Sequence, residues 1–107
     1  MTLEKNFACE LGYTDRYAYE IVNRVSEKTL EVRRLKATRD RSFEPVFIPG
    51  GFSAHCVNQS EQKWTFESDE KAPVIRIRKK KHYDYWTYKG HKFVLTEAPR
   101  EFYDYNF

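Results

Sequence analysis

The sequence is poor in cysteine, glycine and proline, and it lacks long apolar runs. Its 107 residues include two Cys, four Gly and four Pro. Cys9 and Cys56 could form one bridge at most, which excludes a disulfide-stapled scaffold, and in a reducing cytosol we expect two free, packed thiols. No apolar stretch is long enough to cross a bilayer, and no basic segment followed by an apolar one opens the chain. We therefore expect neither export nor a membrane partner.

The spacings that usually mark catalytic or metal sites are also missing. No Cys-x-x-Cys or His-x-x-x-His pattern occurs, and Pro49-Gly50-Gly51 lacks the further glycines and the Lys-Ser/Thr pair of a phosphate-binding loop. Cys56 is predicted on the core side of a strand, where a thiol is a poor nucleophile. Because no known catalytic arrangement is present, we expect a protein that is not an enzyme and that holds no metal and no cofactor.

Aromatic residues, in contrast, are abundant. There are eight Phe, eight Tyr and two Trp, more rings than the core of so small a chain easily encloses. Tyr and Trp combine an apolar body with a polar group, so some of them are expected at a subunit interface or a ligand site. The length suits a single domain over residues 1–107.

The hydrophobic pattern predicts short β-strands. Polar and apolar residues alternate in segments separated by turn residues, with no helical stripe lasting three turns. The expected strands, with hairpins joining the first two and the last two, are 16–25, 29–33, 46–48, 52–57, 64–66, 74–79, 83–88 and 92–95. Residues 1–14 are expected to be a loose lead-in and residues 37–45 a long loop. This predicts a mostly β fold, a small twisted antiparallel sheet or partly open barrel with short helical segments, in an obligate oligomer.

The tail, residues 100–107, is too aromatic for a solvated terminus. We expect it to pack back on the body or on a second subunit. Arg100 opens this tail, and an unpaired charge there would be costly if the tail were buried. A fixed anion, either a carboxylate or a ligand phosphate, would remove that cost.

Basic residues are concentrated between Lys71 and Lys92. This segment has eight Lys or Arg and one acid, Asp84, and four rings lie among them: Tyr83, Tyr85, Trp86 and Tyr88. Cations interleaved with rings suit phosphates and bases, because cationic groups pair with phosphate oxygens and rings stack on bases. The alternatives are a solvated turn at residues 79–81 and strand charges that protect a sheet edge.

Four sequence segments resemble one known family. They are Gly-x-Thr-Asp-Arg at 12–16, Pro-Gly-Gly-Phe-x-x-His-x-x-Asn-Gln at 49–59, Gln-Lys-Trp-Thr-Phe at 62–66 and Arg-Glu-Phe-Tyr-Asp-Tyr-Asn-Phe at 100–107. They resemble segments of the phage Thoeris anti-defence 1 proteins, which are sponges for an immune nucleotide. The resemblance covers most of the chain from Gly12 on.

The resemblance implies a function in the cytoplasm of an infected bacterial host. Thoeris TIR-domain proteins make a cyclic ADP-ribose isomer that switches on a suicidal effector, and the sponge binds this messenger at a homodimer interface without cleaving it. Some members are hexamers that also hold cyclic trinucleotides in separate sites. On this interpretation nucleic acid is not an expected partner. A small basic β module that binds DNA or RNA is the alternative.

The candidate ligand-binding residues follow from both lines of reasoning. Arg100 would contact pyrophosphate, Gly50 and Gly51 would let the backbone approach a ligand or simply form a turn, and a ring such as Trp64 would stack on the base or belong to the core. His55 and Asn58 could hydrogen-bond to a base edge or a ribose. The full candidate set is Arg16, Gly50, Gly51, Phe52, His55, Asn58, Trp64, Trp86 and Arg100.

Overall fold

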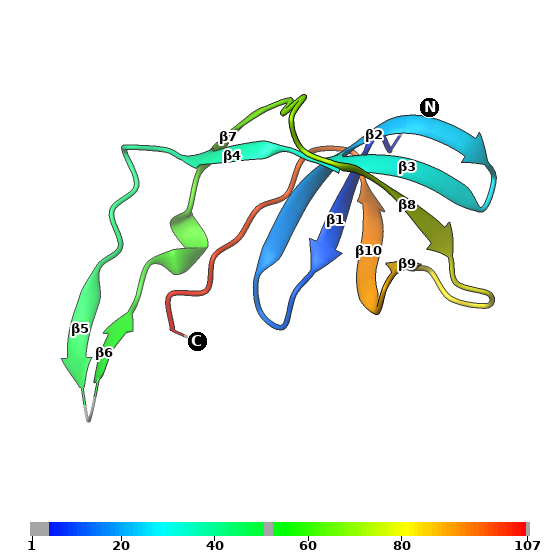
Figure 1. Ribbon diagram of the computed structural model, residues 1–107. Coiled ribbons are helices and arrows are strands. Elements are labelled where there is room, and N and C mark those ends of the chain that lie inside the picture. Colours follow the sequence, from blue (N-terminus) through cyan, green and yellow to red (C-terminus); the bar gives the residue numbers. More distant parts are fainter. Residues whose placement is uncertain (1–4, 51–52, 107) are drawn as a thin grey trace.

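The centre of the fold is a closed six-stranded antiparallel barrel (Figure 1). The computed structural model describes residues 5–50 and 53–106 of the chain. Around the barrel the strands follow the order β1, β10, β9, β8, β3, β2, back to β1. Their bounds are β1 Phe7–Leu11, β2 Arg16–Ser26, β3 Thr29–Arg34, β8 Val74–Lys79, β9 Trp86–Tyr88 and β10 His91–Thr96. A mostly β fold is therefore confirmed, and the sheet closes on itself.

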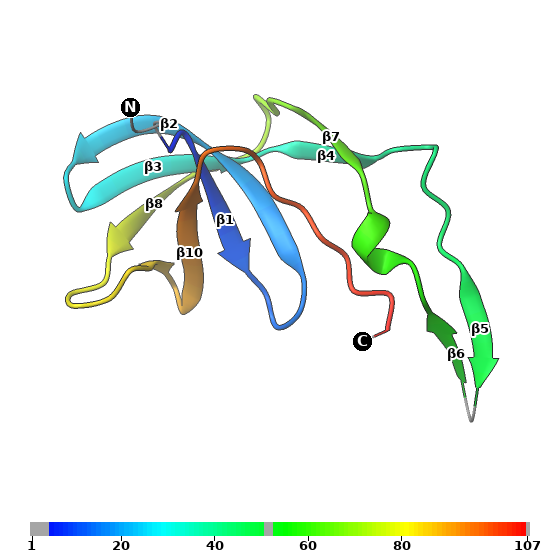
Figure 2. The same cartoon turned by 180° about the vertical axis from the view of Figure 1, so that it is seen from behind.

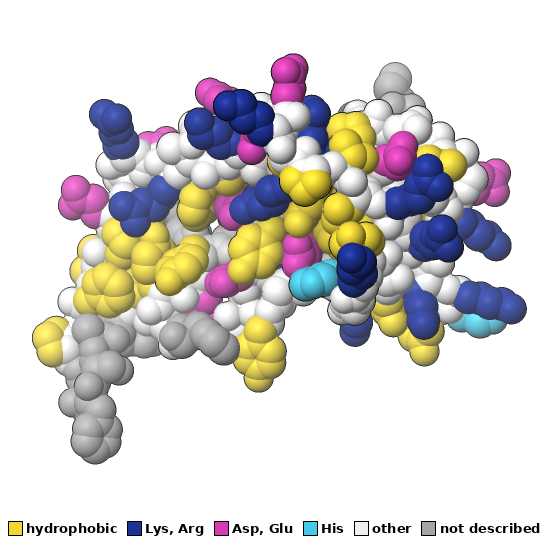
Figure 3. All heavy atoms as spheres, in the orientation of Figure 1, with side chains coloured by type: hydrophobic (Ala, Val, Ile, Leu, Met, Phe, Trp, Pro, Cys, Tyr) yellow, Lys and Arg dark blue, Asp and Glu magenta, His cyan; other side chains and the backbone are white. Residues whose placement is uncertain are grey.

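An arm projects from one side of this barrel (Figures 1 and 2), and the molecule measures 50 × 33 × 28 Å. The arm consists of two two-stranded ribbons and one 3-10 turn: β4 Lys36–Arg39 with β7 Trp64–Glu67, β5 Phe47–Gly50 with β6 Ser53–Cys56, and η1 Gln59–Glu61. Several apolar side chains on the arm are about half exposed, among them Val46, Phe47, Ile48 and Val57. Figure 3 shows apolar side chains on the surface at this end of the molecule.

The barrel interior is filled by alternate residues of its strands. On β3, Leu30 and Val32 are buried while their neighbours face outward, as the two-residue period of a strand requires. The buried core comprises Ala8, Leu30, Val32, Ile77, Trp86 and Phe93. The Tyr19 ring packs edge-on against Phe93, with ring centroids 5.2 Å apart. Two register shifts in the β2–β3 pair, after Ile21 and after Arg24, bend the long β2 and help the barrel close.

The expected hairpins are present, and two further strands occur where none was expected. Residues 16–25 and 29–33 form β2 and β3, and the last expected hairpin forms β9 and β10. The expected strand at 83–88 is shorter than predicted, because residues 83–85 belong to the β8–β9 loop. The expected lead-in contains β1, which lies between β2 and β10 and closes the barrel. Ala8 and Cys9 are both buried, so β1 lacks the alternation that marks a strand. The expected loop at 37–45 begins within β4, a strand too polar and exposed for such a pattern.

The C-terminal tail runs between the barrel and the arm (Figures 1 and 2). Phe102 forms an antiparallel bridge with Arg16 at the start of β2. Further along, the Tyr105 amide donates to the Gln59 side chain at 2.9 Å, and the Cys56 amide donates to Asn106 Oδ1 at 2.6 Å. The tail thus joins the two parts of the molecule.

The described part of the chain contains no helix with the length and apolar character needed to cross a membrane.

Candidate ligand site between the tail and β7

A cavity of about 590 Å³ lies where the tail passes β7 and the start of β2. Such a volume falls within the usual range for small-molecule sites. Its walls are formed by Thr14, Arg16, Gln62, Trp64, Phe66, Pro99, Arg100, Glu101 and Phe102. Three segments far apart in the sequence therefore build one hollow, which combines three rings with two guanidinium groups.

Strand pairing fixes the two faces of the cavity. The Arg16 amide donates to the Phe102 carbonyl at 2.9 Å, and the Phe102 amide donates back to Arg16 at 3.0 Å. Trp64 and Phe66 are two residues apart on β7, so their side chains share a face of that strand. Gln62 Oε1 accepts from Trp64 Nε1 at 3.1 Å and from the Tyr103 amide at 3.0 Å. The tail is thus tied to both β2 and β7.

The carboxylate in the cavity wall is already neutralised. Glu101 receives two hydrogen bonds of 2.8 Å from the Arg34 guanidinium and one of 2.9 Å from the Ala18 amide. Paired hydrogen bonds of this kind are the strong form of an ion pair. The Arg34 guanidinium also lies 5.4 Å from the centre of the Tyr17 ring. Glu101 therefore has little remaining charge with which to balance the cavity's two arginines.

Those arginines give the cavity a positive potential. Arg16 Nη1 donates to the Asp15 carbonyl at 2.9 Å and to the Gly12 carbonyl at 3.4 Å, which are neutral acceptors. Within residues 5–50 and 53–106, the Arg100 guanidinium has no hydrogen-bond or ion-pair partner, and the residue is exposed. The sequence predicts that Arg100 needs an anionic partner if it is buried with the tail. In the structure solvent reaches it, so its charge is available at the cavity mouth.

The structure brings three of the nine predicted residues together and places four others, Gly50, His55, Asn58 and Trp86, elsewhere. Arg16, Trp64 and Arg100 line the same cavity. Gly50 ends β5 and His55 lies in β6, both on the arm, while Gly51 and Phe52 lie outside the described residues. Asn58 lines a different cavity. Trp86 is 6% exposed in the barrel core, where its ring packs with the other core residues.

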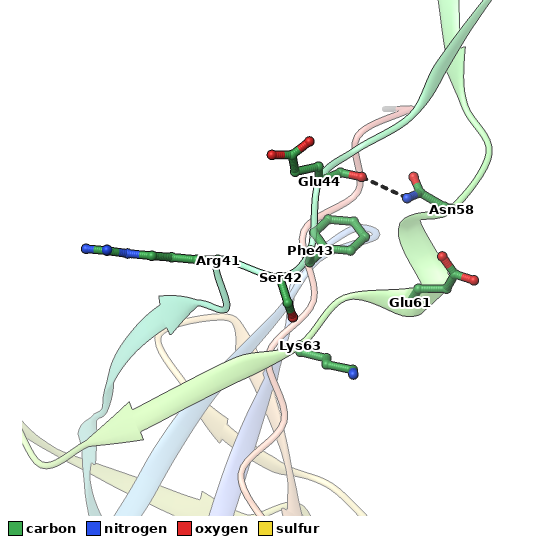
Figure 4. Close-up of a pocket in the computed structure, with 7 residues that line it drawn as sticks. All are labelled: Arg41, Ser42, Phe43, Glu44, Asn58, Glu61 and Lys63. Atoms are coloured by element: carbon green, nitrogen blue, oxygen red, sulfur yellow. Dashed lines mark hydrogen bonds between the residues drawn. The ribbon is translucent and has the colours of Figure 1, made fainter.

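The cavity that Asn58 lines has a volume of about 580 Å³ and lies within the arm, where the chain passes between the β4–β7 and β5–β6 ribbons (Figure 4). Asn58 Nδ2 donates to the Glu44 carbonyl at 2.8 Å, and its Oδ1 accepts from the Val46 amide at 2.7 Å. Its amide is therefore occupied in fixing the chain that leads into β5. The lining of this cavity includes residues of both charges: Arg41, Glu44, Glu61 and Lys63.

Two wall residues that sequence reasoning missed are aromatic. Phe66 lies two positions after Trp64, so the two-residue period of a strand could have placed both side chains on the same face. The sequence gives a weaker indication for Phe102, because it does not show which part of the molecule the tail packs against. The Glu101–Arg34 pair joins residues 67 positions apart, and no local pattern reports such a contact.

The two cysteines are free and buried. Burial raises the pKa of the Cys9 thiol, which keeps it protonated and unreactive near neutral pH. In the described ranges, no group of three or more His, Cys, Asp or Glu side chains is placed to hold a metal ion.

Comparisons of the chain with protein-family models, with curated proteins and with solved structures found no match.

Proposed function

We propose that this protein binds and sequesters a cyclic ADP-ribose isomer without cleaving it, and so blocks Thoeris immune signalling in the cytoplasm of the infected host. The observation that supports this most is the convergence of Arg16, Arg100, Trp64 and Phe102 on one cavity of about 590 Å³. Guanidinium groups pair with pyrophosphate oxygens, and aromatic faces stack on adenine. The messenger's identity comes from the resemblance of four sequence segments.

Binding without cleavage agrees with the chemistry of the cavity wall. Hydrolysis of a glycosidic or pyrophosphate bond needs a general base or a nucleophile within reach of the substrate. Glu101 is the carboxylate in this wall, and both of its oxygens accept hydrogen bonds from Arg34. Both oxygens are thus already engaged by Arg34, which leaves no free carboxylate among the described residues of this wall to act as a general base or nucleophile. The wall therefore favours binding over catalysis.

The proposal includes a homodimer or a hexamer. A two-stranded hairpin is marginally stable by itself in water, and the arm exposes Phe47 and Ile48 to 47% and 53%. Packing against a second copy would bury these side chains. The cavity around Asn58, which contains Arg41 and Lys63, is the place we propose for the separate site that holds cyclic trinucleotides in some members.

A capture-and-release experiment tests the proposal. Purified protein is incubated with the products of an active TIR cyclase, unbound material is removed, the protein is denatured by heat, and the released compounds are identified by mass spectrometry. We expect an intact cyclic ADP-ribose isomer. Release of linear ADP-ribose would show an enzyme instead, and an empty protein would refute the proposed ligand.

The Arg100→Ala variant then tests the cavity. Loss of one charged hydrogen-bonding group should weaken binding by about tenfold to a hundredfold in calorimetry, while the melting temperature stays near that of the wild type because Arg100 is exposed. Arg78→Ala, at an exposed position on β8, is the matched control and should bind normally. Equal affinity of the two variants would rule out this cavity as the binding site.

A further inference from the structure

The end of the barrel that carries the β8–β9 loop has a strong excess of positive charge. The segment from Lys71 to Lys92 holds eight of the chain's 19 Lys and Arg residues but one of its 16 acids. The remaining sequence thus has 11 basic and 15 acidic residues, a net negative charge. Figure 3 shows Lys and Arg side chains gathered where Figure 1 places β8, β9 and the loop between them.

The barrel brings part of this segment onto one surface, here called the basic end, made of Lys79, Lys80, Lys81, Tyr83, Tyr85 and Lys92. β9 pairs with both β8 and β10, and Lys92 on β10 reaches the β8–β9 loop, where it contacts the Tyr85 ring. The Lys89–Gly90 turn lies at the other end of β9. The adjoining β2–β3 turn adds Glu27 and Lys28, whose charges cancel, and its Lys28 carbonyl accepts the Lys79 amide at 2.9 Å. Asp84, in the β8–β9 loop, is the one acid between Lys71 and Lys92.

Two tilted aromatic rings lie among these cations in the basic end. The Tyr83 and Tyr85 rings have centroids 5.2 Å apart and an interplanar angle of 37°. Lys92 Nζ lies 4.9 Å from the centre of the Tyr85 ring, which is the geometry of a cation–π contact. Tyr83 is 54% exposed, so much of this ring faces solvent and can receive a planar group.

Backbone contacts hold the loop in shape, which distinguishes it from a freely solvated lysine run. The Lys80 amide donates to the Tyr85 carbonyl at 3.0 Å, and the Tyr83 amide donates to the Lys80 carbonyl at 3.2 Å. Lys79 Nζ also donates to the Tyr83 carbonyl. His82 has a φ of 69°, a left-handed conformation that non-glycine residues adopt uncommonly and that often occurs at functional sites. A fixed loop loses less entropy when it binds a ligand.

We propose that the basic end is a docking surface for single-stranded nucleic acid. The lysines would contact successive phosphates, and the exposed Tyr83 ring would stack on a base. Stacking favours a single strand over a duplex, because the faces of paired bases are covered by their neighbours. The cavity between the tail and β7 is a separate site, so this surface is an addition to the proposed sequestration of a small nucleotide.

Fluorescence anisotropy with a labelled oligothymidylate of about twelve nucleotides tests the proposal. We expect binding at about 50 mM NaCl that weakens steeply with salt, with a log–log slope near −3 if about four phosphates are contacted. A duplex of the same length should bind several times more weakly. No binding at low salt, or tighter binding of the duplex, would overturn the proposal.

Two variants separate charge from stacking. Lys80→Glu with Lys81→Glu should reduce affinity at least tenfold, whereas the control pair Lys36→Glu with Lys71→Glu, at exposed positions outside the basic end, should change it much less. Tyr83→Leu should weaken binding about tenfold at constant charge. Equal losses in the two charge variants, or an unaffected Tyr83→Leu, would overturn the proposed surface. So would binding to phosphatidylserine vesicles without binding to the oligonucleotide.

Discussion

At the scale of single residues, Glu101 connects three parts of the chain. Its carboxylate binds Arg34 on β3 and the Ala18 amide on β2, and it belongs to the tail. The Glu101 side chain is 9% exposed and that of Arg34 is 32% exposed. Removing the carboxylate would leave a partly buried guanidinium and a buried amide without their acceptor, and such losses are costly.

Glu101→Ala should therefore lower the free energy of unfolding by about 2–3 kcal/mol. Urea denaturation followed by tryptophan fluorescence measures this change. Glu97→Ala, at an exposed position in the same region, is the control and should stay within about 0.5 kcal/mol of the wild type. If both variants unfold alike, the ion pair does not hold the tail in place.

At the scale of the elements, the β9–β10 hairpin depends on its two-residue turn. Lys89 has a φ of 45° and Gly90 a φ of 83°, and two positive φ values in succession are typical of the type I′ turn that suits the twist of a hairpin. A Cβ atom added at Gly90 would meet nothing within 4 Å. A side chain at position 90 would therefore destabilise the protein through its backbone conformation, and not through a clash with the rest of the fold.

Gly90→Ala should destabilise the protein by about 1 kcal/mol because alanine disfavours this backbone conformation. Lys89→Gly, one position earlier, should be neutral or slightly stabilising in the same thermal melt. The reverse order of stability would contradict the proposed dependence on positive φ.

The elements also differ in how well the sequence predicts them. The hairpins β2–β3 and β9–β10 combine alternating residues with short polar or glycine-containing turns, and these local signals predict them correctly. β1 and β4 give no such signal, because β1 is covered on both faces at Ala8 and Cys9 and β4 is mostly exposed. A strand shows a two-residue period when it has one buried and one solvated face, a condition that neither of these strands meets.

At the scale of the whole molecule, burial of phenols predicts a loss of stability in alkali. Burial, together with the hydrogen bond from Tyr19 Oη to Glu10 at 2.8 Å, raises the pKa of Tyr19 in the folded state. Burial likewise raises the pKa of Tyr17. The folded state holds these protons more tightly than the unfolded chain does. Stability is therefore unaffected below about pH 10, the ordinary pKa of tyrosine, and falls as the pH rises above it.

Urea midpoints measured from neutral pH to beyond the ordinary tyrosine pKa check this expectation. We expect the midpoint of the wild type to fall in the alkaline range and that of Tyr19→Phe to fall less, since the variant has no phenol to ionise at that position. Tyr103→Phe, which alters a ring 52% exposed, should follow the wild type. A wild-type midpoint that does not change with pH would refute the argument.

Local sequence signals predict the mostly β fold class and the main hairpins. The sequence also names Arg16, Trp64 and Arg100 as candidates, without showing that the three lie together. The fold signals are readable because strand alternation and turn chemistry are local, and Arg100 is noticed because it stands at the start of an aromatic tail. The tertiary structure decided that the sheet closes, that Trp86 fills the barrel, and that Glu101 is neutralised by Arg34. It also decided which of the predicted residues share a cavity. Those outcomes depend on contacts between distant parts of the chain, which no local pattern encodes.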